Sequence, residues 1–217
     1  MERGPARSAL DYFPDDLDYE HLRIASMQCR GCDLYKLGTQ TVFGEGPKRP
    51  QVMMIGEQPG DEEDKEGHPF VGPAGRLLTK ALGDANIDRE QMYLTNAVKH
   101  FKWKPAGKRR IHQKPNAGEI NACRPWLAAE IEVLAPKMIV CLGATAAQTL
   151  LGSSFKVTQM RGKWMEYEDG QKLIATVHPS SILRAFDSDA RKEQYAAFVS
   201  DLQTVAIGMR ELGILAG

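Results

Sequence analysis

The stretch that most limits how this chain can fold covers residues 52–78. It opens with an apolar run, residues 52–55, which is ended by the small turn Gly56-Glu57-Gln58-Pro59-Gly60. A short apolar run ended by Gly and Pro is typical of a buried strand. A Gly- and Pro-rich loop follows, and helical spacing of apolar residues begins at about Ala74. Strand, loop and helix in this order predict an open α/β sheet, in which ligands bind outside the carboxyl ends of the strands.

Two interpretations of the loop are open at this point. The loop has neither a G-x-G-x-x-G motif nor the Lys-Ser/Thr ending of a Walker loop, so it is not a nucleotide cradle of the usual kinds. It offers backbone donors and polar side chains around a flat slot beside Phe70. The alternative is a surface loop whose acidic run, residues 61–64, is solvated.

Three further apolar runs repeat the strand pattern, at residues 92–97, 137–142 and 173–177. Helices are expected over residues 19–28 and 76–86, from Asn116 or Gly118, after Gly143, and from about Ala190. Residues 155–168 contain candidate edge strands. Strands that alternate with helices predict a mostly parallel sheet with helices on both faces. We expect one domain over residues 1–217, with residues 1–18 as a loosely held N-terminal arm.

Composition places the chain among ordinary globular proteins. It has 217 residues, and its 28 Lys and Arg residues balance 28 Asp and Glu residues, so the whole chain has no bulk attraction to nucleic acid. No apolar stretch approaches the roughly 20 residues that span a membrane, and the N-terminus has no apolar core like that of a secretory signal. We therefore expect a cytoplasmic protein with no membrane partner.

One segment departs strongly from this neutral average. Residues 99–115 contain seven Lys or Arg residues and no acid, with Phe101 and Trp103 interleaved among the charges. Phosphate contacts and base stacking are what single-stranded nucleic acid binding requires. The alternative is a solvated loop whose aromatic residues pack inward.

Polar residues follow three of the apolar runs. Glu57 and Gln58 come after the first, Asn96 ends the second, and His178 follows the last. Because the carboxyl ends of parallel strands meet at one edge, these residues are expected in a single crevice. An Asn amide donates and accepts at once, so it can pair with an amide-like edge of a ligand. The alternatives are a strand-end cap for Asn96 and a structural role for His178.

The four cysteines indicate a metal site. Cys29 and Cys32 form a C-x-x-C pair whose intervening Gly31 permits a tight turn, and Cys123 and Cys141 supply two more thiols. In a cytoplasmic protein such a set favours Zn²⁺ or an iron–sulfur cluster, and spacing alone does not choose between them. The alternative, four unrelated buried thiols, suits Cys141 in its apolar strand better than it suits the C-x-x-C pair.

Together these motifs resemble a known family. The turn Gly56-Glu57-Gln58-Pro59-Gly60, the stretch Gly67-His68-Pro69-Phe70-Val71-Gly72-Pro73-Ala74-Gly75, the strand ending in Asn96 and His178-Pro179-Ser180-Ser181 look like the family-four uracil-DNA glycosylases. The resemblance runs from about Cys29 to the last helix. It implies a three-layer α/β/α sandwich around a central, mostly parallel, four-stranded sheet.

A narrower resemblance concerns the basic segment. The turn at residues 56–60 together with Lys108-Arg109-Arg110-Ile111-His112 is similar to the UdgX group, in which the histidine of this loop attacks the deoxyribose. The resemblance implies excision of uracil from DNA, with the enzyme left covalently bound at C1′ of the abasic site after one turnover. The alternatives are an ordinary multiple-turnover glycosylase and a non-catalytic, metal-containing protein that binds single-stranded nucleic acid.

The resemblance also assigns roles to residues. It implies His112 as nucleophile, Glu57 and Gln58 as groups that orient it, and His178 as the donor that stabilises the departing uracil. Uracil would be bound by Asn96, by stacking on Phe70 and by the backbone at Gly60 and Asp61. DNA would be contacted by Lys108, Arg109, Arg110, Ser180, Ser181 and Arg184, and a structural [4Fe–4S] cluster would be held by Cys29, Cys32, Cys123 and Cys141. The expected partners are uracil-containing DNA, single-stranded or double-stranded, and free uracil as product, with the enzyme acting as a monomer.

Overall fold

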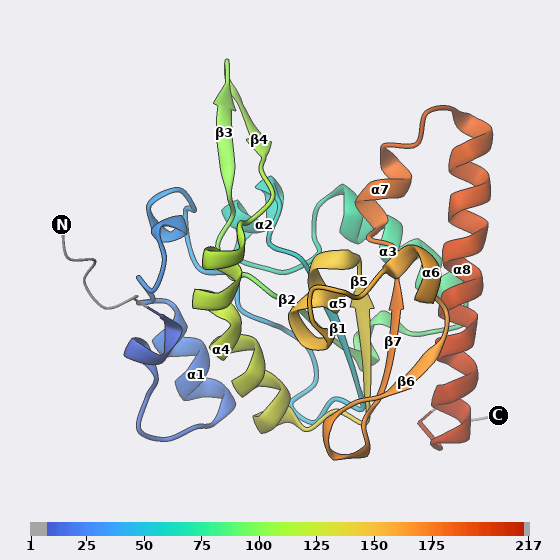
Figure 1. Ribbon diagram of the computed structural model, residues 1–217, viewed down its shortest axis with the longest axis horizontal. Coiled ribbons are helices and arrows are strands. Elements are labelled where there is room, and N and C mark those ends of the chain that lie inside the picture. The colour runs from blue at the N-terminus through green and yellow to red at the C-terminus, as the bar shows by residue number, and fades with distance from the viewer. Residues whose placement is uncertain (1–7, 215–217) are drawn as a thin grey trace.

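The protein is built on a five-stranded sheet. The computed structural model describes residues 8–214, and its main sheet has the strand order β2-β1-β5-β7-β6 (Figure 1). The strands are β1 (Val52–Gly56), β2 (Met92–Asn96), β5 (Met138–Leu142), β6 (Trp164–Glu166) and β7 (Lys172–Thr176). Neighbouring pairs among β2, β1, β5 and β7 are parallel. The expected mostly parallel α/β architecture is therefore confirmed.

The expected number of four strands is one too few. The fifth strand, β6, comes from the segment with candidate edge strands and pairs antiparallel with β7. It covers only three residues, and a short antiparallel strand at the edge of a parallel sheet is a common way to end such a sheet. The strand is too short for a clear alternating pattern, which is why periodicity alone left its assignment open.

Helices and turns account for most of the remaining described chain. The helices are α1 (Tyr19–Ser26), α2 (Asp61–Glu66), α3 (Pro73–Asp84), α4 (Ala117–Leu134), α5 (Ala144–Leu151), α6 (Val157–Met160), α7 (Pro179–Leu183) and α8 (Ser188–Glu211). Four 3-10 turns are η1 (Ala9–Tyr12), η2 (Asp33–Lys36), η3 (Arg89–Gln91) and η4 (Glu168–Gly170). Among the described residues, none of the helices is long and apolar enough to cross a membrane.

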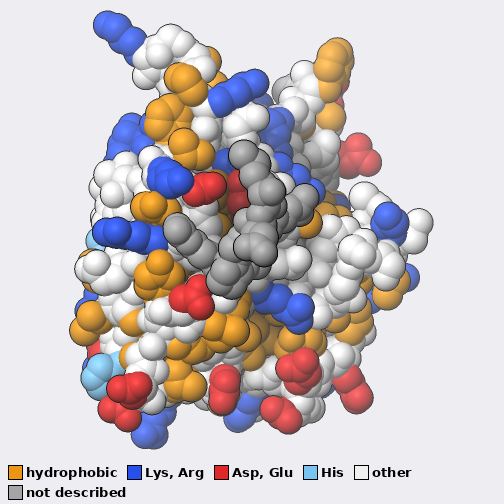
Figure 2. Space-filling view, turned by 60° about the vertical axis from the view of Figure 1, so that its left-hand side comes forward, with side chains coloured by type: hydrophobic (Ala, Val, Ile, Leu, Met, Phe, Trp, Pro, Cys, Tyr) orange, Lys and Arg blue, Asp and Glu red, His pale blue; other side chains and the backbone are white. Residues whose placement is uncertain are grey.

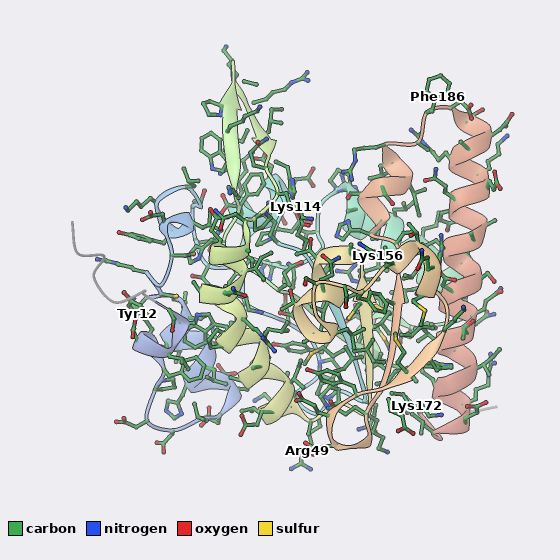
Figure 3. All side chains as sticks on the ribbon, in the orientation of Figure 1. Tyr12, Arg49, Lys114, Lys156, Lys172 and Phe186 are labelled. Carbon is green, nitrogen blue, oxygen red and sulfur yellow. The ribbon has the colours of Figure 1, made fainter. Side chains whose placement is uncertain are left out.

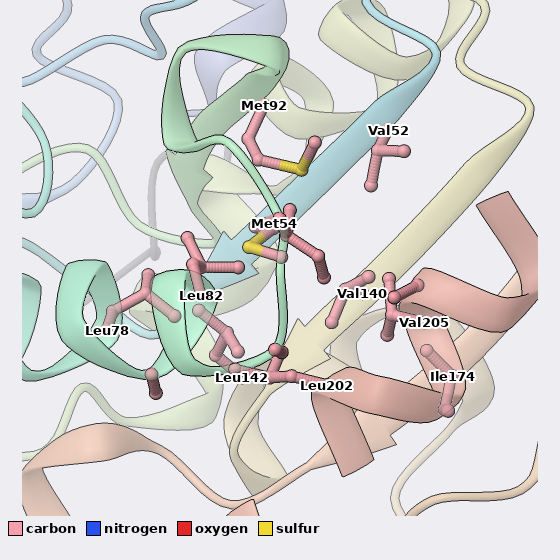
Figure 4. Packing of buried hydrophobic residues seen from close by; sticks show 14 of the residues in the cluster. Val52, Met54, Leu78, Leu82, Met92, Val140, Leu142, Ile174, Leu202 and Val205 are labelled. Carbon is pink, nitrogen blue, oxygen red and sulfur yellow. The ribbon is translucent and has the colours of Figure 1, made fainter. Parts of the chain in front are cut away.

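Alternation along the strands produces the three layers. In β1, Val52 and Met54 face the cluster that contains Leu78 of α3 and Leu202 of α8 (Figure 4). Met53 and Ile55 face the opposite cluster, which contains Leu127 of α4 and Ala146 of α5. Because successive side chains of a strand point to opposite faces, a continuous apolar run requires helices on both sides.

Part of the N-terminal segment contacts the body of the protein. Residues 1–7 lie outside the described residues. From residue 8 onward the chain packs against α4: Ala9 is fully buried, and the rings of Phe13 and Trp126 are 4.8 Å apart. Ala9 and Phe13 therefore belong to a third apolar cluster, while the expectation of a loosely held arm stays a prediction.

Two segments expected as loops are regular structure. The acidic run after β1 forms α2, in which Glu63 is 7% exposed and Asp64 is fully buried, so it is not a solvated surface loop. The basic segment forms a hairpin of β3 (Trp103–Ala106) and β4 (Arg109–His112) that projects from the body of the protein (Figure 1). Both α2 and the hairpin lie at the carboxyl end of the parallel strands, where the candidate site is found.

Candidate active site

The centre of the site is the point where β1 and β2 end side by side. Gly56 is in register with Asn96, and both strands stop there. A Cβ atom on Gly56 would overlap Oδ1 of Asn96 and come within 2.7 Å of Cζ of Phe70. Only glycine at this position leaves room for the amide and the ring. The structure thus brings together two of the residues expected to bind a base.

Phe70 is held in an unusual backbone conformation. Its φ is 56°, in the left-handed region that most residues avoid. The guanidinium of Arg89 donates to the carbonyl oxygen of Phe70 at 3.0 Å and to Oγ1 of Thr79 at 2.7 Å. Backbone strain of this kind persists where the surroundings over-determine it, and it is common at ligand sites. Sequence analysis did not single out Arg89.

His178 follows β7 and caps α7. The ring of His178 lies 6.2 Å from the ring of Phe70, centroid to centroid, in a stacked arrangement. The backbone N–H of Ser180 donates to Nδ1 of His178 at 3.2 Å, so Nδ1 is an acceptor and the ring proton of the neutral form is on Nε2. Burial, followed by the nearby Arg184 and His112, lowers the pKa of His178 to about 4. At neutral pH the ring is therefore an uncharged N–H donor.

The two serines of the predicted DNA contact are occupied within the protein. Oγ of Ser180 is 2.8 Å from Nδ1 of His178, and Oγ of Ser181 donates to the carbonyl oxygen of the same histidine at 2.8 Å. Both hydroxyls therefore orient His178. Arg184 is exposed, and the pKa shifts of His112 and His178 both include its charge, so it stands close to the two rings.

The ring of His112 comes to the site from the end of the hairpin. Its Nε2 lies 3.5 Å from Oε1 of Glu57, the residue that follows β1. The other carboxylate oxygen of Glu57 accepts a hydrogen bond from Oγ1 of Thr145, in the first turn of α5. Burial lowers the pKa of His112, Glu57 opposes this effect, and Arg184 adds to it. The imidazole is therefore neutral, with a lone pair available, at pH 7.

Arg110 anchors the hairpin to α2. Its Nε donates to Oδ1 of Asp61 at 2.5 Å, and its Nη1 donates to Oδ2 of the buried Asp64 at 2.6 Å. The guanidinium also lies over the rings of Phe101 and Trp103, at 5.3 and 5.5 Å from the ring centroids. The side chain is only 17% exposed. Arg110 is therefore half-buried and paired with two acids of α2, which makes it an anchor of the hairpin, and its expected role as a DNA contact stays a prediction.

Gln58 clamps the base of the same hairpin. Its Oε1 accepts from the backbone N–H of Lys102 at 3.1 Å, and its Nε2 donates to the carbonyl oxygen of Gln113 at 3.1 Å. Glu57 and Gln58 thus have different positions: Glu57 faces the His112 ring, while Gln58 holds the two strands that carry it. The sequence left this division open.

The turn after Gln58 is closed by Glu63. One carboxylate oxygen of Glu63 accepts from the N–H of Gly60 at 3.1 Å, and the other accepts from the N–H of Gly72 at 2.9 Å. The backbone donor of Gly60 is therefore used within the protein. Asp61 lies at the first position of α2 and pairs with Arg110 and Lys65. The expected contacts of the Gly60 and Asp61 backbone with uracil stay predictions.

The surface around the site carries exposed basic and aromatic residues. Lys108 and Arg109 are exposed at the tip of the hairpin and line a groove of about 470 Å³ between the hairpin and α2. Figure 2 shows Lys and Arg side chains near this upper end of the molecule. On the other side of the site, the turn between α7 and α8 presents Phe186, which is 98% exposed (Figure 3). The site thus lies between the β3–β4 hairpin on one side and the turn between α7 and α8 on the other.

The structure does not bring the four cysteines together. Cys29, Cys32 and Cys123 share the apolar cluster under the N-terminal segment, and their charges influence one another. Cys141 lies in the middle of β5 in a different cluster, where burial raises its pKa to about 12. The expected four-thiol set is therefore wrong in its fourth member, because the strand carries Cys141 into the sheet.

Two further observations bear on a metal at this place. Within residues 8–214, no three Cys, His, Asp or Glu side chains are arranged so that they could hold a metal ion. Trp126, one helical turn after Cys123, has a fully buried Nε1 with no hydrogen-bond partner among the described residues. A buried, unpaired N–H in the same cluster as three thiols fits a sulfur-rich, hydrogen-bond-accepting group there.

Comparison with known proteins agrees with the fold. The sequence matches the Uracil DNA glycosylase superfamily over residues 43–203. A type-4 uracil-DNA glycosylase of Thermotoga maritima is 40% identical over 166 residues, which cover 76% of this chain and 83% of that protein. The type-4 enzyme of Archaeoglobus fulgidus is 36% identical over 76% of this chain and 86% of its own length. The chain belongs to the uracil-DNA glycosylase superfamily.

Proposed function

We propose that this protein is a DNA-repair glycosylase that removes uracil from DNA and is captured on the abasic site through His112. The relatives named above are type-4 uracil-DNA glycosylases, which supports the uracil-excising activity. The 3.5 Å contact between Nε2 of His112 and Oε1 of Glu57 is the observation that carries the covalent step. The enzyme acts as a monomer on uracil-containing DNA and releases free uracil.

Recognition begins with a base outside the helical stack, because the glycosidic bond cannot be reached in a paired duplex. The amide of Asn96 pairs with the edge of uracil, which offers an adjacent carbonyl and N–H, and Phe70 stacks on the ring. The residue His178 donates Nε2–H to a uracil oxygen. As the base leaves with the bonding electrons, that donor stabilises the growing negative charge.

Capture of the sugar follows from the position of His112. The bond between C1′ and N1 of uracil breaks, and its electron pair leaves with uracil. The ring nitrogen of His112 that has the lone pair bonds to C1′, and the proton on the other ring nitrogen passes to the carboxylate of Glu57. Uracil then takes up a proton from solvent. The product is an N-alkyl imidazole, a covalent enzyme–DNA bond that is not turned over, so the enzyme stops after one turnover.

An ordinary multiple-turnover glycosylase is the second candidate. The relatives are named as uracil-DNA glycosylases without reference to a covalent product, and that name fits a water nucleophile equally well. In this case Glu57 activates the water, and the hairpin serves DNA binding through Lys108 and Arg109.

We also propose that a [4Fe–4S] cluster is bound under the N-terminal segment. The residues that hold it include Cys29, Cys32 and Cys123, whereas Cys141 is too deep in the sheet to take part. The bound cluster supplies a structural cross-link between the C-x-x-C turn and α4. Burial raises the pKa of Cys123 to about 12, and a bound cation reverses that effect because metals bind thiolates.

A denaturing gel tests the function directly. The protein is mixed with end-labelled single-stranded DNA that contains one uracil, heated in SDS and separated. We expect a DNA band shifted to the mass of protein plus oligonucleotide, and no shift when thymine replaces uracil. Unshifted DNA that breaks at the uracil position after alkali treatment indicates the multiple-turnover enzyme. Binding without either product indicates a non-catalytic nucleic-acid-binding protein.

Two histidine variants locate the attacking group. His112→Ala should abolish the shifted band, and alkali-sensitive sites should remain if water reaches C1′. His68→Ala is the matched control, because this exposed histidine pairs with Glu45 on the surface. Its band should be unchanged. A shifted band of full intensity from His112→Ala would disprove that His112 is the nucleophile.

A further inference from the structure

A buried lysine lies directly behind Asn96. Lys99 is 1% exposed, and its ammonium donates to the backbone carbonyl oxygen of Asn96 at 2.8 Å and to Oγ1 of Thr95 at 2.7 Å. The third partner is the carboxylate of Glu130 on α4, which is also fully buried. All three N–H groups of the ammonium thus donate a hydrogen bond. One of these bonds goes to Asn96, the residue that is proposed to bind uracil.

Glu130 also accepts hydrogen bonds from other groups near Lys99. Its carboxylate accepts hydrogen bonds from the hydroxyls of Tyr93 at 2.8 Å and Thr95 at 3.0 Å, and from the backbone N–H of Gly44 at 3.1 Å. A pair of opposite charges with every partner supplied can persist inside a protein, although an apolar pair of the same shape would often be as stable. The network therefore indicates that these residues fix the position of neighbouring groups more than they stabilise the folded protein.

The same lysine also reaches the cysteine cluster. Its backbone N–H donates to Sγ of Cys123 at 3.3 Å, while its side chain holds Asn96. The carbonyl oxygen of Asn96 belongs to the last residue of β2, and the next residue, Ala97, donates its backbone N–H to the carbonyl oxygen of Gly56 at 2.9 Å. The ammonium of Lys99 and this backbone bond together fix the peptide that carries the Asn96 side chain.

We propose that Lys99 and Glu130 are positioning residues for base recognition, acting through Asn96 and linking it to the cysteine cluster. The proposal rests on the uracil-excising activity proposed above. Neither side chain touches the substrate. The pair orients the Asn96 amide toward the base, so its loss should weaken both uracil binding and the excision step while the hairpin and His112 stay in place.

Single-turnover kinetics and a double-mutant cycle test this. Lys99→Met should slow uracil excision at saturating DNA by at least about 30-fold, since small misplacements of a binding group are this costly. Tyr93→Phe is the matched control, because it removes a hydrogen bond to Glu130 and leaves the contact between Lys99 and Asn96 in place. It should stay within about threefold of the unchanged protein.

The cycle with Asn96→Ala separates positioning from general damage. In the Asn96→Ala background, Lys99→Met should cost no more than about twofold, because the group it positions is gone. An undiminished 30-fold cost in that background would overturn the proposal. Glu130→Gln, which keeps the side-chain shape, should show the same dependence on Asn96 and serves if Lys99→Met does not fold.

A measurement without catalysis distinguishes this inference from the proposed function. The side-chain amide resonance of Asn96, assigned with Asn96→Asp, is followed by NMR as free uracil is added. In the unchanged protein we expect this resonance to shift as uracil is added. In Glu130→Gln we expect its chemical shift to differ already before uracil is added. A higher uracil concentration should then be needed to shift it further. An amide unaffected by Glu130→Gln would disprove the positioning role even if the protein excises uracil. A protein that excises no uracil, with an amide displaced by the substitution, would retain the positioning link and reject the function.

Discussion

Nε2 of His112 and Oε1 of Glu57 lie 3.5 Å apart, and the two residues are held there by separate supports. Glu57 is fixed by the end of β1 and by the hydroxyl of Thr145. His112 is fixed by a hairpin that Arg110 ties to α2 and Gln58 clamps at its base. The geometry of the pair therefore depends on residues that touch no substrate.

The first prediction concerns the anchor of the hairpin. Arg110→Met removes two charge-assisted hydrogen bonds and leaves Asp64 buried without its cation. Each such bond contributes roughly 1.5–3 kcal/mol, and we expect the equivalent of one of them to be lost from the attacking geometry, so the covalent adduct should form about 10- to 100-fold more slowly. Quenched time courses on the denaturing gel measure this rate.

Arg109→Met is the control for that variant. Arg109 is exposed on the same strand, so its loss should weaken DNA binding and reduce its salt dependence while the adduct rate at saturating DNA is kept. Equal adduct rates for the two variants at saturation would show that the anchor does not position His112.

The second prediction concerns pH. Attack requires neutral His112, so the adduct rate should fall with decreasing pH through the pKa of this residue, which burial lowers below 6.5. Glu57 raises that pKa and Arg184 lowers it. Glu57→Gln should therefore move the midpoint to lower pH, and Arg184→Met should move it to higher pH. Rate–pH profiles of the three proteins give the midpoints, and shifts in the same direction would contradict the assignment.

The third prediction concerns the space between Asn96 and Phe70. Gly56→Ala places a methyl group against both side chains, so uracil excision should fall by about 100-fold, the usual effect of a displacement near 1 Å. Gly83→Ala is the control, since a Cβ there meets nothing within 4 Å. At the penultimate position of α3 it should raise the free energy of unfolding by up to roughly 0.5–1 kcal/mol and keep the activity. Urea unfolding and single-turnover assays check both.

The fourth prediction concerns the cysteines. Cys141→Ala should keep the full iron and sulfide content, because Cys141 lies in the core of the sheet away from the other three thiols. Cys123→Ser should lose most of the iron. Metal and sulfide analysis of the purified proteins measures this. Loss of iron from Cys141→Ala would restore the four-thiol set that the sequence predicted.

The parts of the fold that local pattern predicts are those with a strong period. The runs that became β1, β2, β5 and β7 each bury side chains on both faces, which shows in the sequence as continuous apolar residues. The capped helix beginning after Asn116 has its signal in a few neighbouring residues. The strand β6 and the helix α2 lack such a signal, because one is too short and the other is built of charged residues.

The sequence by itself determined which chemistry is present and at which ends of strands it stands: Glu57, Asn96 and His178 follow apolar runs, and parallel strands must end at one edge. Only the tertiary structure decided how these groups are held. Arg110 anchors the hairpin because it forms ion pairs with Asp61 and Asp64 of α2. Cys141 lies apart from the other three cysteines because β5 places it in the core of the sheet. Lys99 and Glu130 form an ion pair because tertiary packing brings the segment after β2 against α4. Pairings between distant segments leave no period in the sequence, and they appear only when packing brings the segments together.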